Sequence, residues 1–485
     1  MTRRLLLGAA SAALFIVLAT ANAGGYRFGA SDQAFYLPAI TQAADPGRFV
    51  HDAELLAVQT RFWLGDELAG WLVMQAGLSL ERLAGLGYVT SLLLLAGAAA
   101  YFGRGLGASW LAIVAGLALL TMRHRIARTG ANSLEGYFHP RMLAFAIGVW
   151  ALGCVLRGRQ TAALVLIGAC AIVHSTTALW FGAAVLMAMA WQVDRRAVWA
   201  ALALMLASGV GLFSGGSRMD AAWLAVLAGK DYLFPSDWPA YAWVVNLAYP
   251  AVLIALVNRR RLRGPLSPGE LAVVVGLLGL VAGFLISVLL SAHAVALAVQ
   301  AQVSRVFWIL DAITLIYLAA WLVDDWGARS ARRWRVAAVA ALAAVAAVRG
   351  GYVLAQSDRP LFSWTLPADD WTATMSWLSA QPDPLHVLAD PGHALKYGSS
   401  VRVAARRDTV LEHVKDSSIA MYDRRIASRV AERALALQGF DELSTAAMLD
   451  LGRRYAADVA VVESPHALAL PVLYRTPRFV VYDLR

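Results

Sequence analysis

Long apolar runs recur along the first 355 residues of the chain, separated by short polar segments. A helix that crosses a bilayer needs about 20 mostly apolar residues, and most of these runs approach that length. The pattern predicts about eleven spans, the first within residues 1–25 and the others near 85–102, 107–122, 141–156, 160–174, 177–192, 197–213, 241–257, 271–291, 306–323 and 336–354. The predicted fold is therefore a polytopic α-helical membrane protein.

The pattern changes near residues 356–360, beyond which charged residues are spread throughout and apolar runs are short. Strand-like runs and helical spacings alternate there, which predicts a small α/β domain over 356–485. The expected strands are 384–390, 457–464 and 477–485, and the expected helices are 417–437 and 440–456. The preceding residues 1–355 form the predicted transmembrane module, with a long first outer loop at 24–84.

Composition supports a membrane protein, because only 15% of the residues are charged and the mean hydropathy is +0.59, whereas soluble proteins average about 25% charged. The net charge of +10 does not indicate nucleic acid, since arginine concentrates in short loops and no zinc or nucleic-acid motif is found. Cys154 and Cys170 fall in apolar segments, so we interpret them as small buried residues.

Arginine placement predicts the orientation in the membrane, because cytoplasmic loops carry an excess of Lys and Arg. Alternation places one set of basic segments inside: Arg3-Arg4, Arg104, 157–159, Arg195-Arg196, 258–264 and 332–335. An odd number of crossings then puts the C-terminal domain outside, which is the periplasmic face of a bacterial inner membrane. The first segment has a basic start, an apolar run and Ala-Asn-Ala, so it is either a retained helix or a cleaved signal.

One loop breaks this bias, because residues 122–141 place several arginines on the outer side. The loop either holds an anion or is a tolerated surface loop. Histidines accumulate at the same depth, in or beside outward loops: His51, His124, His139, His174 and His293. A site at the outer membrane surface is the simplest explanation of both features.

The first outer loop adds carboxylates to that surface. Asp32, Asp45, Asp52 and Glu54 follow the first apolar run closely. Residues 55–83 are amphipathic and include Trp63 and Trp71, which predicts a helix lying along the interface.

Here the chain resembles the GT-C superfamily of polytopic glycosyltransferases, which includes protein O-mannosyltransferases and aminoarabinose transferases. The local match is "SDQAFYLPAI", where family members carry an Asp followed by an aromatic residue, with Asp45-Pro46, Phe49 and Asp52 behind it. "HPRMLAF" at 139–145 and "HSTTALWF" at 174–181 resemble patterns in uncharacterised bacterial members.

The resemblance implies an inverting enzyme that moves a sugar from a polyprenyl-phosphate carrier to a glycan, lipid or protein acceptor outside the membrane. The family's first-loop Asp acts as general base or orients the acceptor, and this role carries over onto Asp32, with Asp52 as second choice. Gln33 follows Asp32 where many mannosyltransferases have Glu, which leaves the donor sugar open.

The leaving group of such a transfer is a lipid phosphate, which needs cations. The candidates for binding it are Arg123, Arg125, Arg128, Arg141 and Arg305, with His139 and His174 as hydrogen-bond donors. Tyr36 is expected to anchor the turn of Asp32 at the interface. Asp311 lies within a predicted span, where a carboxylate is costly and functional by default. Its expected partner is an outer-face Arg or His, in the site or as a structural pair.

Two other functions remain open from the sequence. A transporter would also be polytopic, although no internal repeat is evident and ionisable residues gather at one face rather than at the midplane. A catalytically inactive protein of the same fold would bind lipid-linked glycans without transfer. No cofactor is required; a divalent metal is chemically possible at Asp32, Asp52, Glu54 and His139, but no spacing demands one.

Overall fold

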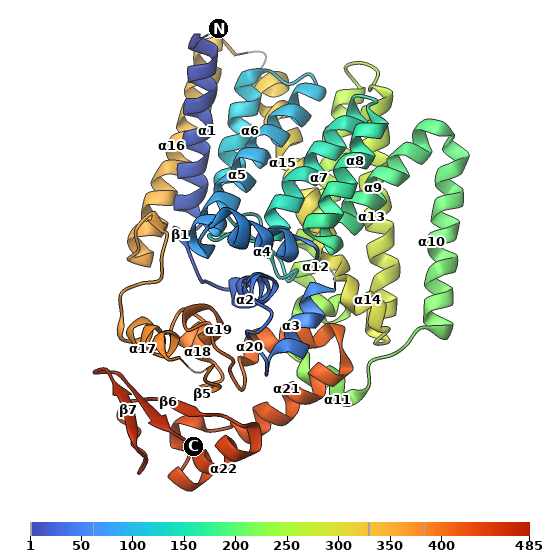
Figure 1. The fold of residues 1–485 in the computed structure, drawn as a ribbon. Helices are drawn as coiled ribbons and strands as arrows, with labels where there is room; N and C mark the ends of the chain where they lie inside the picture. The colour runs from blue at the N-terminus through green and yellow to red at the C-terminus, as the bar shows by residue number, and fades with distance from the viewer. Residues whose placement is uncertain (1, 62, 328–329, 383) are drawn as a thin grey trace. The chain divides into compact units, whose positions relative to one another are not determined.

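The computed structural model describes residues 2–61, 63–327, 330–382 and 384–485, with side chains from Gly8 onward. The chain is mostly helical (Figure 1). It divides into two compact units: unit 1 comprises Met1–Tyr26, Leu86–Met219 and Gly229–Phe362, and unit 2 comprises Arg27–Gly85, Asp220–Ala228 and Ser363–Arg485.

Each predicted span corresponds to a helix among the described residues. These helices are α1 (Thr2–Asn22), α5 (Leu80–Gly105), α6 (Trp110–Thr121), α7 (Pro140–Leu156), α8 (Gln160–Val173), α9 (Ser175–Val193), α10 (Arg195–Gly215), α12 (Ala240–Arg261), α13 (Pro268–Ala292), α15 (Val306–Ala320) and α16 (Arg332–Ser357). Within the described chain, 7 helices are long and apolar enough to cross a membrane. The helices at 8–22, 110–121, 140–156 and 160–173 are apolar but shorter, at 10–17 residues, so eleven crossings stay a prediction.

Close helix packing forms the interior of unit 1. A Cβ at Gly276 on α13 would clash with the carbonyl oxygen of Ala184 on α9, so these helices meet backbone to backbone, as small residues allow in membrane bundles. The ring of Phe145 stacks on Trp308 with centroids 3.9 Å apart. Cys154 and Cys170 are buried free thiols, which confirms the interpretation of both as small core residues.

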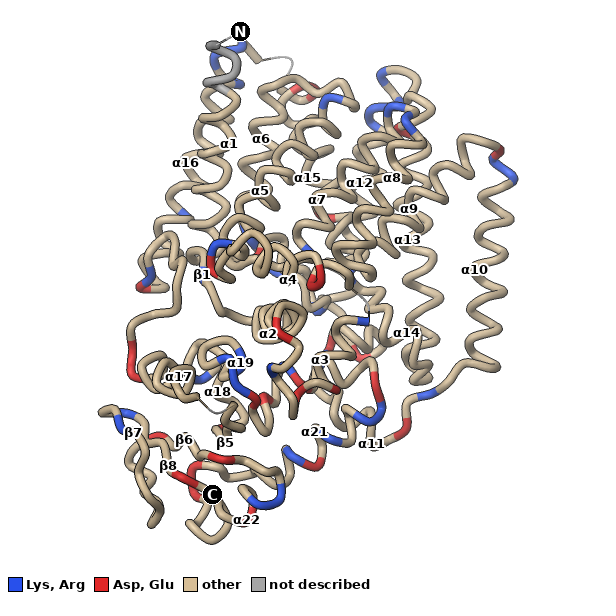
Figure 2. The backbone as a smooth tube through the Cα atoms, in the orientation of Figure 1, with Lys and Arg blue, Asp and Glu red and all other residues tan. Residues whose placement is uncertain are grey.

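The arginine-rich loops of unit 1 lie together at one end of its helices (Figure 2). Arg157, after α7, donates to the carbonyl oxygen of Tyr101 on α5 at 2.5 Å. Arg260, near the end of α12, donates to Glu270 on α13 at 2.8 Å and to the Leu106 carbonyl at 2.8 Å. We call this the arginine-rich end. Gathering these loops at one end is what the predicted alternation requires.

Unit 2 contains a four-stranded sheet in the order β5-β6-β8-β7. Strand β5 (Val387–Ala389) is parallel to β6 (Val459–Glu463), and β8 (Phe479–Asp483) is antiparallel to both β6 and β7 (Val472–Arg475). The three expected strands are thus present. Strand β7 was not predicted, because none of its side chains is buried, so it lacks the apolar pattern of a core strand.

The helices of unit 2 differ from the predictions at their boundaries. The single helix expected at 417–437 is instead α20 (His413–Ile419) and α21 (Arg424–Ala436), because Asp423 caps α21 by accepting from the Arg425 N–H at 2.8 Å. The helix expected from 440 starts later, as α22 (Thr445–Tyr455), where Ser444 accepts from the Ala447 N–H at 3.3 Å. A side-chain acceptor at the N-cap thus sets both starts.

The prediction of a single helix over residues 55–83 is wrong. That stretch forms α3 (Ala53–Thr60), α4 (Gly65–Ala76) and the start of α5. Gly77 ends α4 in the left-handed conformation, with φ +61°, which glycine adopts without strain. Trp63 is buried, and only Trp71 is exposed.

The first outer loop belongs to the same compact unit as the C-terminal segment. Leu55 and Val58 of α3 share a buried apolar cluster with Leu388 of β5 and Val462 of β6. Helix α2 (Gln33–Ala44) and the short helices α17 (Asp370–Ala380), α18 (His393–Lys396), α19 (Val401–Ala404) and α11 (Ala221–Val226) complete the unit. The compact units therefore have other boundaries than the expected domains 1–355 and 356–485, because unit 2 also contains Arg27–Gly85 and Asp220–Ala228.

Candidate functional site

Several of the predicted phosphate-binding residues gather at the end of unit 1 where α7, α9 and α15 begin. Helix α7 starts with Pro140, which suits a first helical position, and His139 is its N-cap. The Nδ1 atom of His139 accepts from the Arg141 N–H at 3.1 Å. The sequence His-Pro-Arg therefore fixes Arg141 in the first turn of the helix.

Arg141 is buried and its charge is balanced. Its Nη2 donates to Oε1 of Glu135 at 2.8 Å, and both side chains are 3% exposed. Its guanidinium carbon lies 5.7 Å from the centre of the Trp308 ring, a cation–π distance. Glu135 also accepts from Asn132 at 3.0 Å. The pair holds an arginine at the end of a membrane helix without leaving its charge uncompensated.

His174 lies at the turn between α8 and α9. Its ring centre is 6.1 Å from that of His139, and its Nδ1 is 3.0 Å from the Thr177 hydroxyl and accepts from the Thr177 N–H at 3.3 Å. Burial lowers the pKa of His174 well below its usual value, and the nearby charges of His139, Arg141 and Arg305 act in the same direction. The ring is therefore neutral, with its proton on Nε2, where it can donate to an anion.

Arg305 ends the short helix η3 (Val303–Arg305) and directly precedes α15. Its guanidinium carbon lies 5.6 Å from the centre of the Tyr232 ring. Arg141 and Arg305 line one pocket together with Thr176, Thr177 and Trp308, and its volume is about 10 Å³. That volume holds about one water, so a phosphate requires these side chains to move apart. We call His139, Arg141, His174 and Arg305 the cation cluster, after its two arginines.

The remaining arginines of the 122–141 loop do not line that pocket. Arg123 donates to the carbonyl oxygen of Leu134 at 2.9 Å. Arg125 is exposed on the two-residue strand β2 (Arg125–Ile126), which pairs with β3 (Ala131–Asn132). Arg128 pairs with Asp231 and donates to the Tyr241 hydroxyl at 3.0 Å. Phosphate binding by these three stays a prediction.

Asp311 has the kind of partner that was expected for it. Its buried carboxylate lies 3.2 Å from Nε2 of His124, which precedes β2. The adjacent Asp311 carboxylate raises the pKa of His124 above its usual value, against an opposing effect of burial. The pair therefore compensates a carboxylate within an apolar helix.

Asp32 lies in unit 2, immediately before α2. Its Oδ1 accepts from Nζ of Lys415 on α20 at 2.7 Å, and Lys415 also reaches the Ser31 hydroxyl at 3.3 Å. Asp32 is 26% exposed and Lys415 is 9% exposed. Within the described chain, the Asp32 side chain makes no capping hydrogen bond to α2. The carboxylate thus stays partly exposed in unit 2, where Lys415 binds it.

Asp52 is fully buried, and arginines donate hydrogen bonds to both of its carboxylate oxygens. Arg402 donates to both of its oxygens, at 2.7 and 3.1 Å, and Arg429 donates to Oδ1 at 2.5 Å. Burial alone would raise the pKa of Asp52, but the charges of Arg402 and Arg429 outweigh it and hold that pKa well below its usual value. Arg402 also binds Asp416 at 2.6 Å. Such a network favours a structural role for Asp52 over contact with an acceptor.

Tyr36 and the possible metal ligands complete the set of predicted site residues. Tyr36 is buried on α2, with its ring 5.2 Å from Trp63 in an edge-on contact. Among the described residues, no group of three or more His, Cys, Asp or Glu side chains is placed to hold a metal ion.

Sequence reasoning missed the partners of these residues: Glu135, Lys415, Arg402, Asp416 and Arg429. Glu135 alone carried a local signal, since it lies six residues before Arg141 in the same loop. Lys415 and Arg402 lie 383 and 350 residues away from their partners, so no spacing rule could connect them.

No protein-family model matches the chain, and no curated protein matches it in sequence. Among solved structures, the chain is similar to the archaeal oligosaccharyltransferase AglB from Archaeoglobus fulgidus, in complex with an inhibitory peptide and a dolichol-phosphate. The TM-score is 0.44 and the identity is 13%, over 95% of this chain and 69% of that chain. Membership of the GT-C superfamily therefore stays a prediction, and the chemistry is inferred from the residues themselves.

Proposed function

We propose that this protein is a membrane glycosyltransferase that moves a sugar from a polyprenyl-phosphate carrier to an acceptor hydroxyl on the outer side of the membrane. The observation that carries the proposal is the cation cluster. Two arginines and two histidines meet where membrane helices begin, and Arg141 and Arg305 line one pocket. Two arginines at that depth, Arg141 buried and Arg305 half-buried, suit the phosphate of a lipid carrier.

The cluster supplies the contacts that a phosphate leaving group needs. Guanidinium groups bind phosphate oxygens through paired hydrogen bonds. His174 is neutral and offers its Nε2–H, since its Nδ1 accepts from Thr177. These donors stabilise the negative charge that develops on the phosphate as the bond from the anomeric carbon to the phosphate oxygen breaks.

Asp32 is our choice for the base. The acceptor oxygen attacks the anomeric carbon on the face opposite the leaving phosphate, so the configuration at that carbon inverts. The proton of the acceptor hydroxyl passes to a carboxylate. Asp32 is part-exposed and oriented by Lys415, whereas Asp52 is buried among arginines. A carboxylate that an acceptor can reach is the better base.

The test is complementation of a deletion strain with full-length variants. Asp32→Asn should leave carrier-linked sugar accumulated in lipid extracts, because loss of a general base costs about 100- to 10,000-fold in rate. Arg305→Gln should do the same, because it removes a cation that stabilises the leaving phosphate. Wild type should clear the accumulated lipid. The matched control is Asp45→Asn, which changes an exposed carboxylate of the same loop that pairs with Arg48.

Several outcomes would contradict the proposal. A deletion strain without accumulated carrier-linked sugar would reject the transfer itself. Full clearance by Asp32→Asn would remove Asp32 as base, and if Asp52→Asn then failed to clear while melting normally, the role would move to Asp52. Purified protein that binds the carrier lipid but transfers nothing would identify a binding protein of the same fold.

A further inference from the structure

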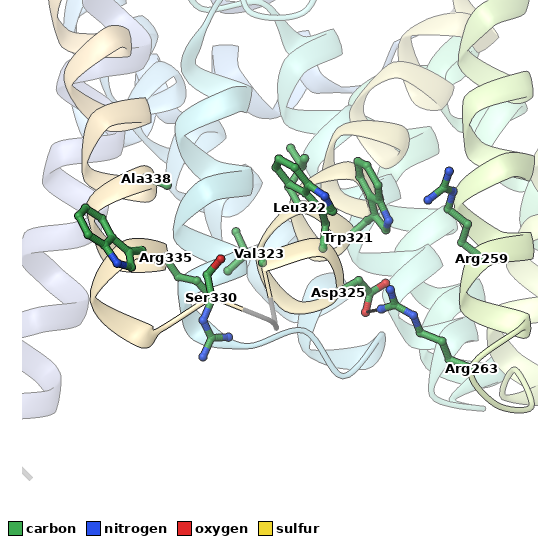
Figure 3. Close-up of a pocket in the computed structure, with 12 residues that line it drawn as sticks. Arg259, Arg263, Trp321, Leu322, Val323, Asp325, Ser330, Arg335 and Ala338 are labelled. Carbon is green, nitrogen blue, oxygen red and sulfur yellow. Dashed lines mark ion pairs between the residues drawn. The ribbon is translucent and has the colours of Figure 1, made fainter.

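A cavity of about 540 Å³ lies at the arginine-rich end of unit 1 (Figure 3). This volume falls in the range of about 300–1,000 Å³ typical of ligand sites. The cavity is bounded by the end of α12, the turn that follows α15 and the start of α16. Arg305 precedes α15 and Trp321 follows it, so this cavity and the cation cluster lie at opposite ends of one helix, about 20 Å long.

The lining carries a net positive charge. Three arginines contribute, Arg259 and Arg263 from the region of α12 and Arg335 from α16, against one described carboxylate, Asp325. Figure 3 shows Arg259 and Arg263 on one side and Arg335 on the other, with Trp321 between them. Arg263 pairs with Asp325, which leaves two arginines to bind an anion.

Those two arginines are held without a carboxylate among the described residues. The guanidinium carbon of Arg259 lies 5.3 Å from the centre of the Trp321 ring. The Nε atom of Arg335 is buried and has no hydrogen-bond acceptor within the described part of the chain. A buried donor without an acceptor is costly, and a ligand with anionic oxygens beside the same guanidinium would compensate its charge.

The wall between the arginines is a π-helical turn, Trp321–Trp326. Such turns are rare and occur frequently at functional sites. This one presents Trp321 and Asp325 to the cavity, while Trp326 and Trp334 at its edge are 70% and 63% exposed. Tryptophan accumulates at headgroup depth in membrane proteins, which places the cavity where a lipid headgroup resides.

We propose that this cavity binds the phosphate headgroup of an anionic phospholipid. The shared chemistry is a phosphate ester bound by guanidinium groups. The exposed tryptophans favour a lipid over a soluble phosphate ester, and basic pockets between membrane helices on the cytoplasmic side bind such headgroups. The site is separate from the proposed sugar transfer and does not depend on it.

The experiment measures binding to the purified full-length protein with three probes: phosphatidylglycerol, phosphatidylcholine and soluble glycerol 3-phosphate. Arg259→Gln and Arg335→Gln should each weaken phosphatidylglycerol binding by about five-fold, and the double variant by about 25-fold, as expected for interfacial arginines. The matched control is Arg196→Gln, which changes an exposed arginine in the first turn of α10, outside the cavity. It should bind like wild type.

Phosphatidylcholine, whose phosphate is balanced by choline, should bind at least five-fold more weakly than phosphatidylglycerol at this site. Equal affinity of the double variant and wild type would overturn the site. Glycerol 3-phosphate binding as tightly as the lipid would overturn the assignment to a phospholipid. If every variant melts at the same temperature as Arg196→Gln, the loss of lipid binding does not come from unfolding.

Discussion

At the scale of single residues, each carboxylate that the sequence singled out is bound by a basic residue within its own unit. Asp32 is bound by Lys415, Asp52 by Arg402 and Arg429, and Asp311 by His124. Exposure then separates their roles, because a carboxylate at 26% exposure can meet a substrate and one at 0% cannot without rearrangement. Accessibility, rather than charge alone, favours Asp32 as the reactive carboxylate.

Glu412 beside this network should make the stability of unit 2 depend on pH. Burial raises the pKa of Glu412 to about 8, and the charge of Asp416 adds to the effect against Arg402 and Lys415. Its Oε2 is buried without a hydrogen-bond partner among the described residues. A raised pKa means that the folded state holds the proton more tightly than the unfolded state, so stability falls as pH rises from about 4.5 to about 8.

Glu412→Gln removes this titration, and we expect its melting temperature to exceed that of wild type at pH 9 and to change less between pH 5.5 and 9. The control is Glu54→Gln, an exposed residue whose charge contacts Arg425 at 3.5 Å. If the melting temperatures of wild type and Glu412→Gln changed equally with pH between 5.5 and 9, Glu412 would be ionised in the folded protein throughout that range.

At the scale of elements, α1 is bound to the rest of unit 1 by buried polar contacts. Asn22 donates to the carbonyl oxygen of Ala346 on α16 at 2.9 Å and accepts from Arg349 at 2.5 Å. Thr20 shares a hydrogen bond with the Tyr88 hydroxyl at 2.9 Å. Removal of α1 would leave these groups on α16 and α5 unsatisfied.

We therefore predict that the first helix is retained rather than cleaved as a signal. The intact mass of the purified protein should include residues 2–23, and Edman sequencing should not find Gly24 as the first residue. A mature chain that begins at Gly24 would establish cleavage and would contradict the packing of α1 on α16.

The long apolar helices could be predicted from the sequence, because the length of each apolar run identifies them. The starts of α21 and α22 were placed three or more residues too early, although the capping residues Asp423 and Ser444 are visible in the sequence. The partners of Asp32 and Asp52 could not be found, because their pairing depends on folding across most of the chain. Local rules describe elements, whereas the ion network is a property of the tertiary fold.

At the scale of the whole molecule, the arginine-rich end of unit 1 predicts the membrane orientation. Alkaline phosphatase, which is active only outside the cytoplasm, should be active when fused after Arg485 and inactive when fused after Leu262. Leu262 directly follows α12, whose last turn carries Arg259, Arg260 and Arg261, and the positive-inside rule assigns such basic segments to the cytoplasm. Activity at Leu262 and none at Arg485 would reverse the topology, together with the proposed side of transfer.

The composition of unit 2 also has a consequence in time. Asp52 is synthesised 350 residues before Arg402, a delay of roughly 20 to 70 s at translation rates of about 5–20 residues per second. Throughout that interval the first loop lacks the residues it packs against, because Leu55 and Val58 are buried against β5 and β6, which are made later. A nascent chain that is interrupted between Leu86 and Phe362 therefore carries a first loop whose apolar partners have not yet been made.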